Sequence, residues 1–326
     1  MRAALIAAYG GPENLVVDDV ERPTPLTGNV LVQVEAAGLN YWDIIERQGL
    51  LPDQPPPPLR AGVEGAGTVV AVAPGVTEPV VGDRVMWAHT PGSHAQVVEV
   101  PAAQTIPLPP WLSTIDAAAV CVQGLTAHFL ANSVRIMAAG DSALVWAAAG
   151  GVSRLLTQML AAKRVRVIAA VSSQAKAEAA LAAGADRAVL YPEVKVVVND
   201  LTDGAGVDVV FDGVGAPTFD TSLDCVRRRG MFVVYGNAGG SLPPIETGRL
   251  FAAGSVHFVR PGLAHFIASR DELLYRANEL FSAIERREVT VRVDATYPLS
   301  GICDAHKALE SRSVIGKVVV LPHLGV

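Results

Sequence analysis

Residues 143–164 read ALVWAAAGGVSRLLTQMLAAKR, and this stretch joins an apolar run to a glycine pair and then to a helix. Its first five residues are uniformly apolar, which is typical of a strand buried on both faces. In residues 154–162 the leucines and Met159 recur at helical spacing. A turn from strand to helix points free backbone N–H groups and the positive end of the helix dipole at one place, which suits a pyrophosphate. The stretch therefore predicts a dinucleotide-binding turn.

The turn carries only part of the usual G-x-G-x-x-G fingerprint. Its second glycine is present at Gly150, whereas Ala148 and Ser153 stand at the first and third positions. The third glycine normally allows close packing of helix on strand, so we expect the hydroxymethyl group of Ser153 to weaken cofactor binding without abolishing it. A tight turn with small residues for packing alone would look similar. We expect four residues of the turn to contact the cofactor: Ala149, Gly150, Gly151 and Val152.

Five more apolar runs follow, separated by helical or loop sequence, at residues 165–171, 188–191, 207–211, 231–235 and 255–259. Continuous apolar strands spaced by helices indicate a parallel sheet covered on both faces. Ligands bind such sheets at the carboxyl ends of the strands, and here those ends are rich in glycine, hydroxyl and amide groups. The sequence therefore predicts an α/β fold with a doubly wound, parallel, six-stranded Rossmann sheet that binds a nucleotide.

The end of the second strand predicts NADPH as the cofactor. Folds that select NAD place Asp or Glu here to hold the ribose 2′-hydroxyl, and such a carboxylate would repel a 2′-phosphate. In this chain the strand ends in Ser172 and Ser173, Lys176 follows, and no acid occurs before Glu178. We therefore expect Ser172, Ser173 and Lys176 to bind the cofactor.

The segments before and after this unit have a different texture. Short alternating segments cut by proline and glycine fill the first 120 residues, which predicts a mainly β domain. At the other end, residues 289–293, 301–309 and 317–321 read as strand, helix and strand. We expect this tail to return to the first domain. The predicted division is a Rossmann domain of residues 121–264 inserted in a discontinuous β-rich domain of residues 1–120 and 265–326, with an apolar active-site cleft between them.

Composition excludes several classes of protein. The net charge is −6 and no basic tract stands out, which argues against nucleic acid or an anionic membrane as a partner. No run approaches the roughly 18 uncharged apolar residues of a membrane span, and no cleavable signal pattern occurs, so a cytoplasmic location is expected. Cys121, Cys225 and Cys303 are far apart and lack C-x-x-C spacing, so neither a disulfide framework nor a structural zinc site is indicated.

The chain resembles a medium-chain dehydrogenase/reductase, and more narrowly the zinc-free NADPH:quinone oxidoreductases related to zeta-crystallin. The resemblance runs nearly end to end and lies in residues 9–13 (YGGPE), 37–40 (AGLN), 62–67 (GVEGAG), 123–128 (QGLTAH), 147–152 (AAAGGV), 212–215 (DGVG), 236–238 (GNA) and 310–312 (ESR). It implies a GroES-like β domain and a homodimer. It also implies hydride transfer from C4 of NADPH to a quinone or another α,β-unsaturated carbonyl.

The resemblance also implies roles for single residues. It places Asn40 and Thr126 beside the nicotinamide, and brings Tyr191 and Arg312 to the 2′-phosphate pocket with Lys176. Two further cofactor contacts are expected at the strand ends that carry the DGVG and GNA motifs: Val214 and Asn237. Zinc alcohol dehydrogenases need Cys and His ligands where this chain reads GLN and GVE, so no metal site is expected.

No catalytic residue is assigned, because hydride transfer to a quinone needs mainly orientation of a cofactor that carries the reactive bond. Ile45 and Leu51 stand where these reductases often carry tyrosine, so a more apolar pocket is expected. The candidates for the substrate cleft are Asn40, Tyr41, Ile45, Leu51 and Thr126. The alternative is a nucleotide- or ligand-binding relative with little redox turnover. A late apolar strand at an open sheet edge must be covered or paired, so a homodimer through the edge strands at residues 231–235 and 255–259 is expected.

Overall fold

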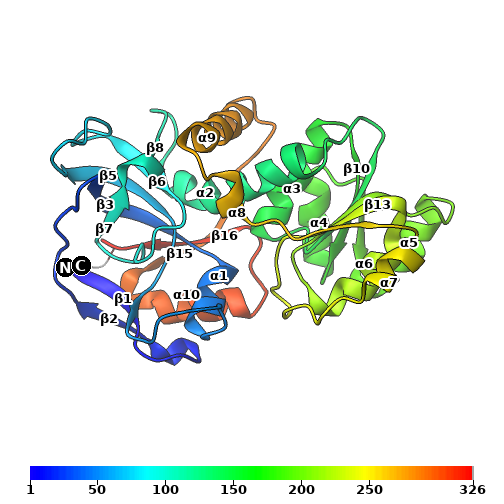
Figure 1. Cartoon of the computed structure of the whole chain (residues 1–326), viewed down its shortest axis with the longest axis horizontal. Coiled ribbons are helices and arrows are strands. Elements are labelled where there is room, and N and C mark those ends of the chain that lie inside the picture. Colours follow the sequence, from blue (N-terminus) through cyan, green and yellow to red (C-terminus); the bar gives the residue numbers. More distant parts are fainter. Residues whose placement is uncertain (325–326) are drawn as a thin grey trace. The chain divides into compact units, whose positions relative to one another are not determined.

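The computed structural model describes residues 1–324, and its chain divides into two compact units. The first unit contains residues 1–125, 267–281 and 291–326, and the second contains residues 126–266 and 282–290. Each unit has β-sheet structure of its own (Figure 1). The domain division expected from the sequence stays a prediction.

The second unit contains the predicted six-stranded sheet, and all of its strand pairs are parallel. The strands follow the order β11-β10-β9-β12-β13-β14, which reverses direction between β9 and β12. This is the order of a doubly wound dinucleotide fold, with its ligand crevice at the reversal. The strands are β9 (Ser142–Trp146), β10 (Arg166–Val171), β11 (Arg187–Leu190), β12 (Val207–Asp212), β13 (Val226–Val234) and β14 (His257–Val259).

Helices cover this sheet because its strands are apolar on both faces. The helices are α3 (Gly151–Ala162), α4 (Gln174–Ala182), α5 (Val194–Leu201), α6 (Phe219–Cys225), α7 (Thr247–Ala252) and α8 (Leu263–Phe266). One core forms where α5, α6 and α7 pack on the side chains of Leu144, Phe232 and their neighbours. On α3 the predicted apolar face is buried, and the helix contacts β9 and β10. The predicted helices and strands of this region are confirmed.

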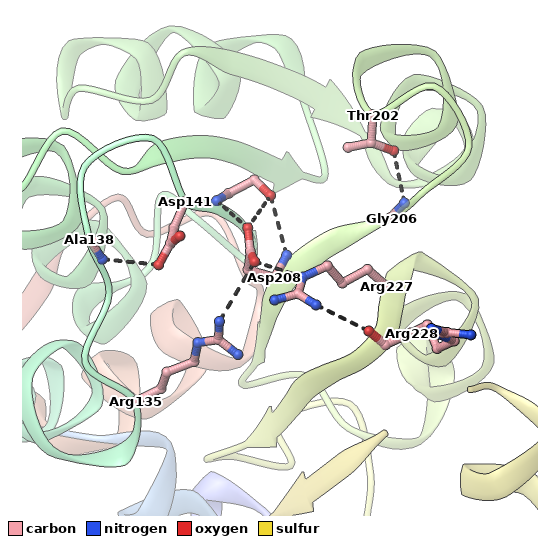
Figure 2. A network of polar contacts seen from close by, with 9 residues as sticks. Arg135, Ala138, Asp141, Thr202, Gly206, Asp208, Arg227 and Arg228 are labelled. Carbon is pink, nitrogen blue, oxygen red and sulfur yellow. Dashed lines mark hydrogen bonds and ion pairs between the residues drawn. The ribbon is translucent and has the colours of Figure 1, made fainter. Parts of the chain in front are cut away.

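A charged network joins the amino ends of three neighbouring strands. Asp208 in β12 accepts hydrogen bonds from the backbone N–H and hydroxyl of Ser142, at 2.8 and 2.9 Å, and from Arg227 Nε at 2.7 Å. Arg135 completes the network with an ion pair to the same carboxylate (Figure 2). Burial raises the pKa of Asp208, but the hydrogen bonds from Ser142 and Arg227 outweigh it and hold the pKa below its usual value. This network braces the sheet at the end opposite to the carboxyl ends of the strands.

The first unit contains two sheets. A seven-stranded sheet has the order β15-β16-β3-β5-β6-β8, with β7 also paired to β3, and a three-stranded sheet has the order β2-β1-β4. The strands are β1 (Arg2–Ile6), β2 (Leu15–Asp19), β3 (Asn29–Leu39), β4 (Leu59–Arg60), β5 (Gly65–Val72), β6 (Arg84–Trp87), β7 (Val97–Pro101), β8 (Ile106–Pro107), β15 (Val293–Pro298) and β16 (Lys317–Leu321). Since β16 pairs antiparallel with β3, the tail returns to the first sheet as predicted.

One predicted strand is wrong in position. The strand expected at residues 289–293 is β15, which begins at Val293 and pairs with β16. Val289 is 1% exposed and belongs to the second unit, so its apolar character reflects a different core. In β15 the side chains alternate between exposed and half-buried positions over its first four residues, which gives no continuous apolar run.

The remaining helices are α1 (Tyr41–Arg47), α2 (Thr114–Phe129), α9 (Arg270–Glu285) and α10 (Ile302–Glu310). Ser113 and Asp116 start α2, since the backbone N–H of Asp116 donates to the Ser113 hydroxyl at 3.0 Å. Among the described residues, the helical stretch Thr114–Val134 has the length and hydropathy of a membrane span, contrary to the expectation that no run approaches one. Buried positions make up 72% of its most apolar window, which is the burial of a core helix.

Candidate functional site

The glycine turn after β9 leaves the start of α3 open to a ligand. Ala147 takes a left-handed φ of +50°, and Gly150 is the N-cap of α3 with extended backbone and no capping hydrogen bond from a side chain. The backbone N–H of Arg154 donates to the carbonyl of Gly150 at 2.8 Å, which is the first bond of the helix. The N–H groups of Gly151 and Val152 come before Arg154 in the helix, so they have no carbonyl group one turn back to accept their hydrogen bonds. The turn therefore fits the pyrophosphate of a dinucleotide.

Ser153, in the first turn of α3, is held by two hydrogen bonds. Its hydroxyl lies 2.8 Å from the carbonyl oxygen of Trp146 and 2.6 Å from the hydroxyl of Tyr235, and its side chain is buried. The side chain therefore joins α3 to the ends of β9 and β13. This arrangement argues against our expectation that the hydroxymethyl group weakens cofactor binding. This contact could not be expected from the sequence, because Tyr235 lies 82 residues away along the chain.

The loop after β12 is ordered by a buried carboxylate. Asp212 Oδ1 accepts hydrogen bonds from the backbone N–H groups of Val214 and Gly215, at 2.7 and 3.1 Å. Its Oδ2 accepts from the hydroxyls of Thr218 and Ser222, at 2.7 and 2.8 Å. Burial raises the pKa of Asp212, and the four donors oppose that effect only in part. Sequence reasoning missed Asp212 as a site residue, although it begins the DGVG motif at the end of an apolar strand.

The loops after β12 and β13 are joined by backbone hydrogen bonds. The N–H of Gly239 donates to the carbonyl of Val214 at 2.7 Å. Gly215 has a φ of +97°, and a Cβ there would lie 2.5 Å from the carbonyl oxygen of Gly240. Asn237 lies in the second loop and donates through Nδ2 to the hydroxyl of Ser241 at 3.3 Å. The predicted residues Val214 and Asn237 are thus on two adjoining loops.

A cation and a hydroxyl lie together at the end of β10. Lys176 Nζ donates to the hydroxyl of Ser172 at 3.1 Å, and Ser173 is the N-cap of α4. Tyr191 follows β11, and its ring packs edge to face on Trp146 with the ring centroids 5.0 Å apart. Because β11, β10, β9, β12 and β13 are neighbours in the sheet, the predicted residues at these strand ends form one row.

In the first unit, Asn40 is held by a buried ion pair. Lys317 Nζ donates to Glu64 Oε1 at 2.5 Å and to Asn40 Oδ1 at 2.8 Å, while Asn40 Nδ2 donates to Glu64 Oε1 at 2.6 Å. Glu64 Oε2 accepts from the backbone N–H of Val122 at 2.6 Å. A Cβ at Gly38 would lie 2.4 Å from Glu64 Oε1, so glycine leaves the room that the carboxylate occupies. Sequence reasoning missed Glu64 and Lys317 as partners of Asn40.

The other candidates of the first unit lie on or near α1. Asn40 is the N-cap of α1, and Tyr41 and Ile45 are half-buried one turn apart on that helix. Leu51 is also half-buried, and Arg312 is an exposed residue that follows α10. Thr126, on α2, falls in the second unit and is 9% exposed. These residues' roles at a cofactor or substrate stay predictions.

A buried acid, Asp43, and a half-buried acid, Glu46, lie on α1. Asp43 accepts a hydrogen bond from the backbone N–H of Asn40 at 2.6 Å, and burial raises its pKa to about 8. Burial also raises the pKa of Glu46 to about 7.

His94 is fully buried, and its Nε2 lies 3.3 Å from the carbonyl oxygen of Gly38. Within residues 1–324, no group of three or more His, Cys, Asp or Glu side chains is placed to hold a metal ion.

Comparison with known proteins gives the family. Family models described as "Alcohol dehydrogenase GroES-like domain" and "Zinc-binding dehydrogenase" match residues 27–110 and 183–320. A quinone oxidoreductase of Pseudomonas aeruginosa is 38% identical over 97% of this chain and 98% of its own. The chain belongs to the NADPH:quinone oxidoreductase family of the medium-chain dehydrogenases/reductases.

Two further members of this family extend the comparison. A 2-haloacrylate reductase of a Burkholderia species is 36% identical over 98% of each chain. The crystal structure of Escherichia coli quinone oxidoreductase complexed with NADPH superposes with a TM-score of 0.96, at 34% identity over 99% of this chain and 100% of that chain. The match to "Zinc-binding dehydrogenase" covers residues 183–320. This range does not include Asn40 or Glu64, which stand in the GLN and GVE segments where zinc alcohol dehydrogenases need their Cys and His ligands.

Proposed function

We propose that this protein is an NADPH-dependent reductase that transfers hydride to a quinone or another α,β-unsaturated carbonyl. The observation that carries the proposal is the open glycine turn at α3, with Lys176 and Ser172 at the neighbouring strand end. The turn fits a pyrophosphate, and the cation and hydroxyl fit a 2′-phosphate. The full-length relatives include a quinone oxidoreductase and a 2-haloacrylate reductase.

NADPH supplies the reactive hydride from C4 of its nicotinamide when it is bound. The protein's part is to bind and orient. The N–H groups of Gly151 and Val152 bind the pyrophosphate beside Ala149 and Gly150. Lys176, Ser172 and Ser173 bind the 2′-phosphate, together with Tyr191 and Arg312. Val214 and Asn237 line the cofactor at the ends of β12 and β13, and the amide of Asn40 and the hydroxyl of Thr126 orient the nicotinamide.

The acceptor is proposed to lie against α1 and the residues after it. Tyr41, Ile45 and Leu51 offer an apolar and aromatic surface, which suits a planar conjugated molecule. A quinone or enone stabilises the added negative charge through its own carbonyl, so the reaction requires no dedicated acid or base. The alternative of a binding protein without turnover loses one of its supports, because the Ser153 hydroxyl is accommodated by two hydrogen bonds.

We further propose a cytoplasmic homodimer. One edge of the six-stranded sheet is β14, a strand of three residues with Phe258 and Val259 half-buried. An open apolar edge favours pairing with a second copy. Light scattering that gave a monomer mass at micromolar concentration would exclude this dimer.

The proposed domains remain residues 1–120 with 265–326, and residues 121–264.

The function is tested by measuring NADPH oxidation with a panel of quinones, enones and 2-haloacrylates. Titration of NADPH by nicotinamide fluorescence runs in parallel, so that binding and turnover are measured separately. We expect micromolar NADPH binding and turnover with at least one class of conjugated acceptor. Measured NADPH binding with no turnover across the whole panel would contradict the reductase proposal.

A further inference from the structure

Two side chains and one backbone carbonyl at the carboxyl end of the sheet form a directed hydrogen-bond chain. Ser153 Oγ lies 2.8 Å from the carbonyl oxygen of Trp146 and 2.6 Å from the hydroxyl of Tyr235. A carbonyl oxygen can only accept, so the Ser153 proton points to Trp146. The hydroxyl of Tyr235 must then be the donor to Ser153. The chain therefore runs from Tyr235 to Ser153 to Trp146, and each hydroxyl proton has one acceptor.

Ser153 and Trp146 are buried and Tyr235 is half-buried, so the members of the hydrogen-bond chain depend on one another. Ser153 is 3% exposed and Trp146 is 2% exposed. Burial moves the pKa of Tyr235 well above its usual value, so its hydroxyl keeps its proton as a donor. A buried hydroxyl left without a partner loses more than the average worth of a hydrogen bond, because its desolvation is no longer offset. Removing Ser153 Oγ alone would leave the Tyr235 hydroxyl in that state.

Tyr235 also lies against the loop after β12. A Cβ at Gly213 would lie 2.8 Å from the Tyr235 hydroxyl oxygen and 2.9 Å from its ring, so the tyrosine packs where only a glycine leaves room. Gly213 in turn accepts a backbone hydrogen bond from Ala238 at 3.2 Å, in the loop after β13. The Tyr235 side chain thus contacts two of the segments that surround the dinucleotide crevice, the first turn of α3 and the loop after β12, and Tyr235 itself begins the loop after β13.

We propose that Ser153 and Tyr235 are positioning residues that take over the task of the missing third glycine of the fingerprint. Where glycine allows the helix to approach the strand closely, this chain joins helix and strand by hydrogen bonds instead. The bonds fix Ser153 relative to the end of β9, and with it the N–H groups of Gly151 and Val152 just before it. This inference rests on the proposed function, because it assigns the two residues to NADPH binding.

The test measures the dissociation constant of NADPH by nicotinamide fluorescence for Ser153→Ala, Tyr235→Phe and the double variant. We expect Ser153→Ala to weaken NADPH binding about fivefold, the factor that corresponds to one typical hydrogen bond. Tyr235→Phe should weaken it less, since Ser153 keeps its bond to Trp146. The double variant should bind NADPH no more weakly than Ser153→Ala, because it no longer leaves the tyrosine hydroxyl unpaired.

Thr157→Val is the matched control. Thr157 lies one turn further along α3, is fully buried, and its hydroxyl has no hydrogen-bond partner in the described structure. Valine keeps its shape and removes the same kind of group, so NADPH affinity should stay unchanged. At saturating NADPH the turnover number of Thr157→Val should also match that of the wild type, which shows that loss of a buried hydroxyl from α3 does not by itself damage the protein.

The outcomes are distinguishable. NADPH affinity equal to the wild type in both single variants, or single effects that multiply in the double variant, would overturn the inference. Should Ser153→Ala fold poorly, Tyr235→Phe, which removes only one oxygen, still tests the inference through its NADPH affinity. A wild-type protein that binds no NADPH would refute the proposed function, and this inference with it.

Discussion

Lys317 Nζ lies 2.5 Å from Glu64 Oε1, in an ion pair whose side chains are 2% and 0% exposed. Both members also bind Asn40, the proposed nicotinamide contact. Removing two charges from water is expensive, and the geometry repays this only while both partners and their extra hydrogen bonds are present. The pair therefore couples the stability of the first unit to the orientation of the Asn40 amide.

Lys317→Met should be strongly destabilising, because it leaves the Glu64 carboxylate buried without its cation. Breaking such a pair costs about 3–5 kcal/mol of unfolding free energy. The double variant, Lys317→Met with Glu64→Gln, should recover a large part of this loss. Urea unfolding measures the free energy of unfolding of both variants. The control is Lys195→Met, which breaks the exposed pair with Asp224 and should change stability little. Equal losses in the single and double variants would show that the charge is not the cause.

The fold could be predicted from the sequence because its decisive signals are local. Apolar runs and a glycine turn gave the six strands and the start of α3 without knowledge of distant contacts. The predicted strand at residues 289–293 was wrong because Val289 is buried in a core that the sequence could not assign. The side-chain partners could not be predicted either: Glu64 and Lys317 are separated by 253 positions, and Ser153 and Tyr235 by 82. Local patterns fix backbone turns, whereas such pairs depend on the completed fold.

Stability should fall as pH rises through neutrality, owing to Asp43. Burial is the main cause of its raised pKa of about 8, with Glu46 and Glu64 adding to it and Lys317 and the Asn40 N–H opposing it. Between about pH 4 and pH 8 the native state keeps a proton that the unfolded state has lost, so the free energy of unfolding decreases over that range. Glu46, whose pKa is raised from 4.5 to about 7, lowers the free energy of unfolding in the same way over the narrower pH range between these two values.

Asp43→Asn should flatten this slope, measured as urea midpoints at pH 5, 6.5 and 8. Asparagine can still accept the hydrogen bond from the Asn40 N–H, so the N-cap geometry is retained. Glu46→Gln should remove only the part of the decrease in unfolding free energy that ends near pH 7. A slope unchanged in Asp43→Asn would mean that Asp43 is ionised in the native protein at neutral pH.

Lys176→Ala should raise the Michaelis constant for NADPH and leave that for NADH nearly unchanged. Its ammonium group lies beside the Ser172 hydroxyl at the end of β10, where a 2′-phosphate is proposed to bind. One charge-assisted hydrogen bond is worth about tenfold in affinity at such a site. Arg312→Ala is expected to act in the same direction, and Lys195→Ala serves as a control for an exposed lysine elsewhere in the second unit. Similar losses with both cofactors would assign Lys176 to another task.

Asp212 should tolerate asparagine far better than alanine. Its Oδ1 accepts hydrogen bonds from two backbone N–H groups, which can only donate and are fixed in direction. Its Oδ2 accepts from the hydroxyls of Thr218 and Ser222, which can rotate and act as acceptors for a new donor. Asparagine can place its oxygen toward the N–H groups and its amide toward the hydroxyls, so Asp212→Asn should cost only about 1 kcal/mol. Asp212→Ala leaves the N–H groups of Val214 and Gly215 without their acceptor and should cost about 3 kcal/mol or more.

The same comparison separates geometry from charge at this loop. Burial raises the pKa of Asp212, so the negative charge is itself a cost that asparagine removes. We therefore expect Asp212→Asn to bind NADPH like the wild type, while Asp212→Ala binds it more weakly because the loop joined to Gly239 loses its order. Fluorescence titration and urea unfolding of both variants measure this. If asparagine were as damaging as alanine, the loop would depend on the carboxylate charge rather than on the pattern of its hydrogen bonds.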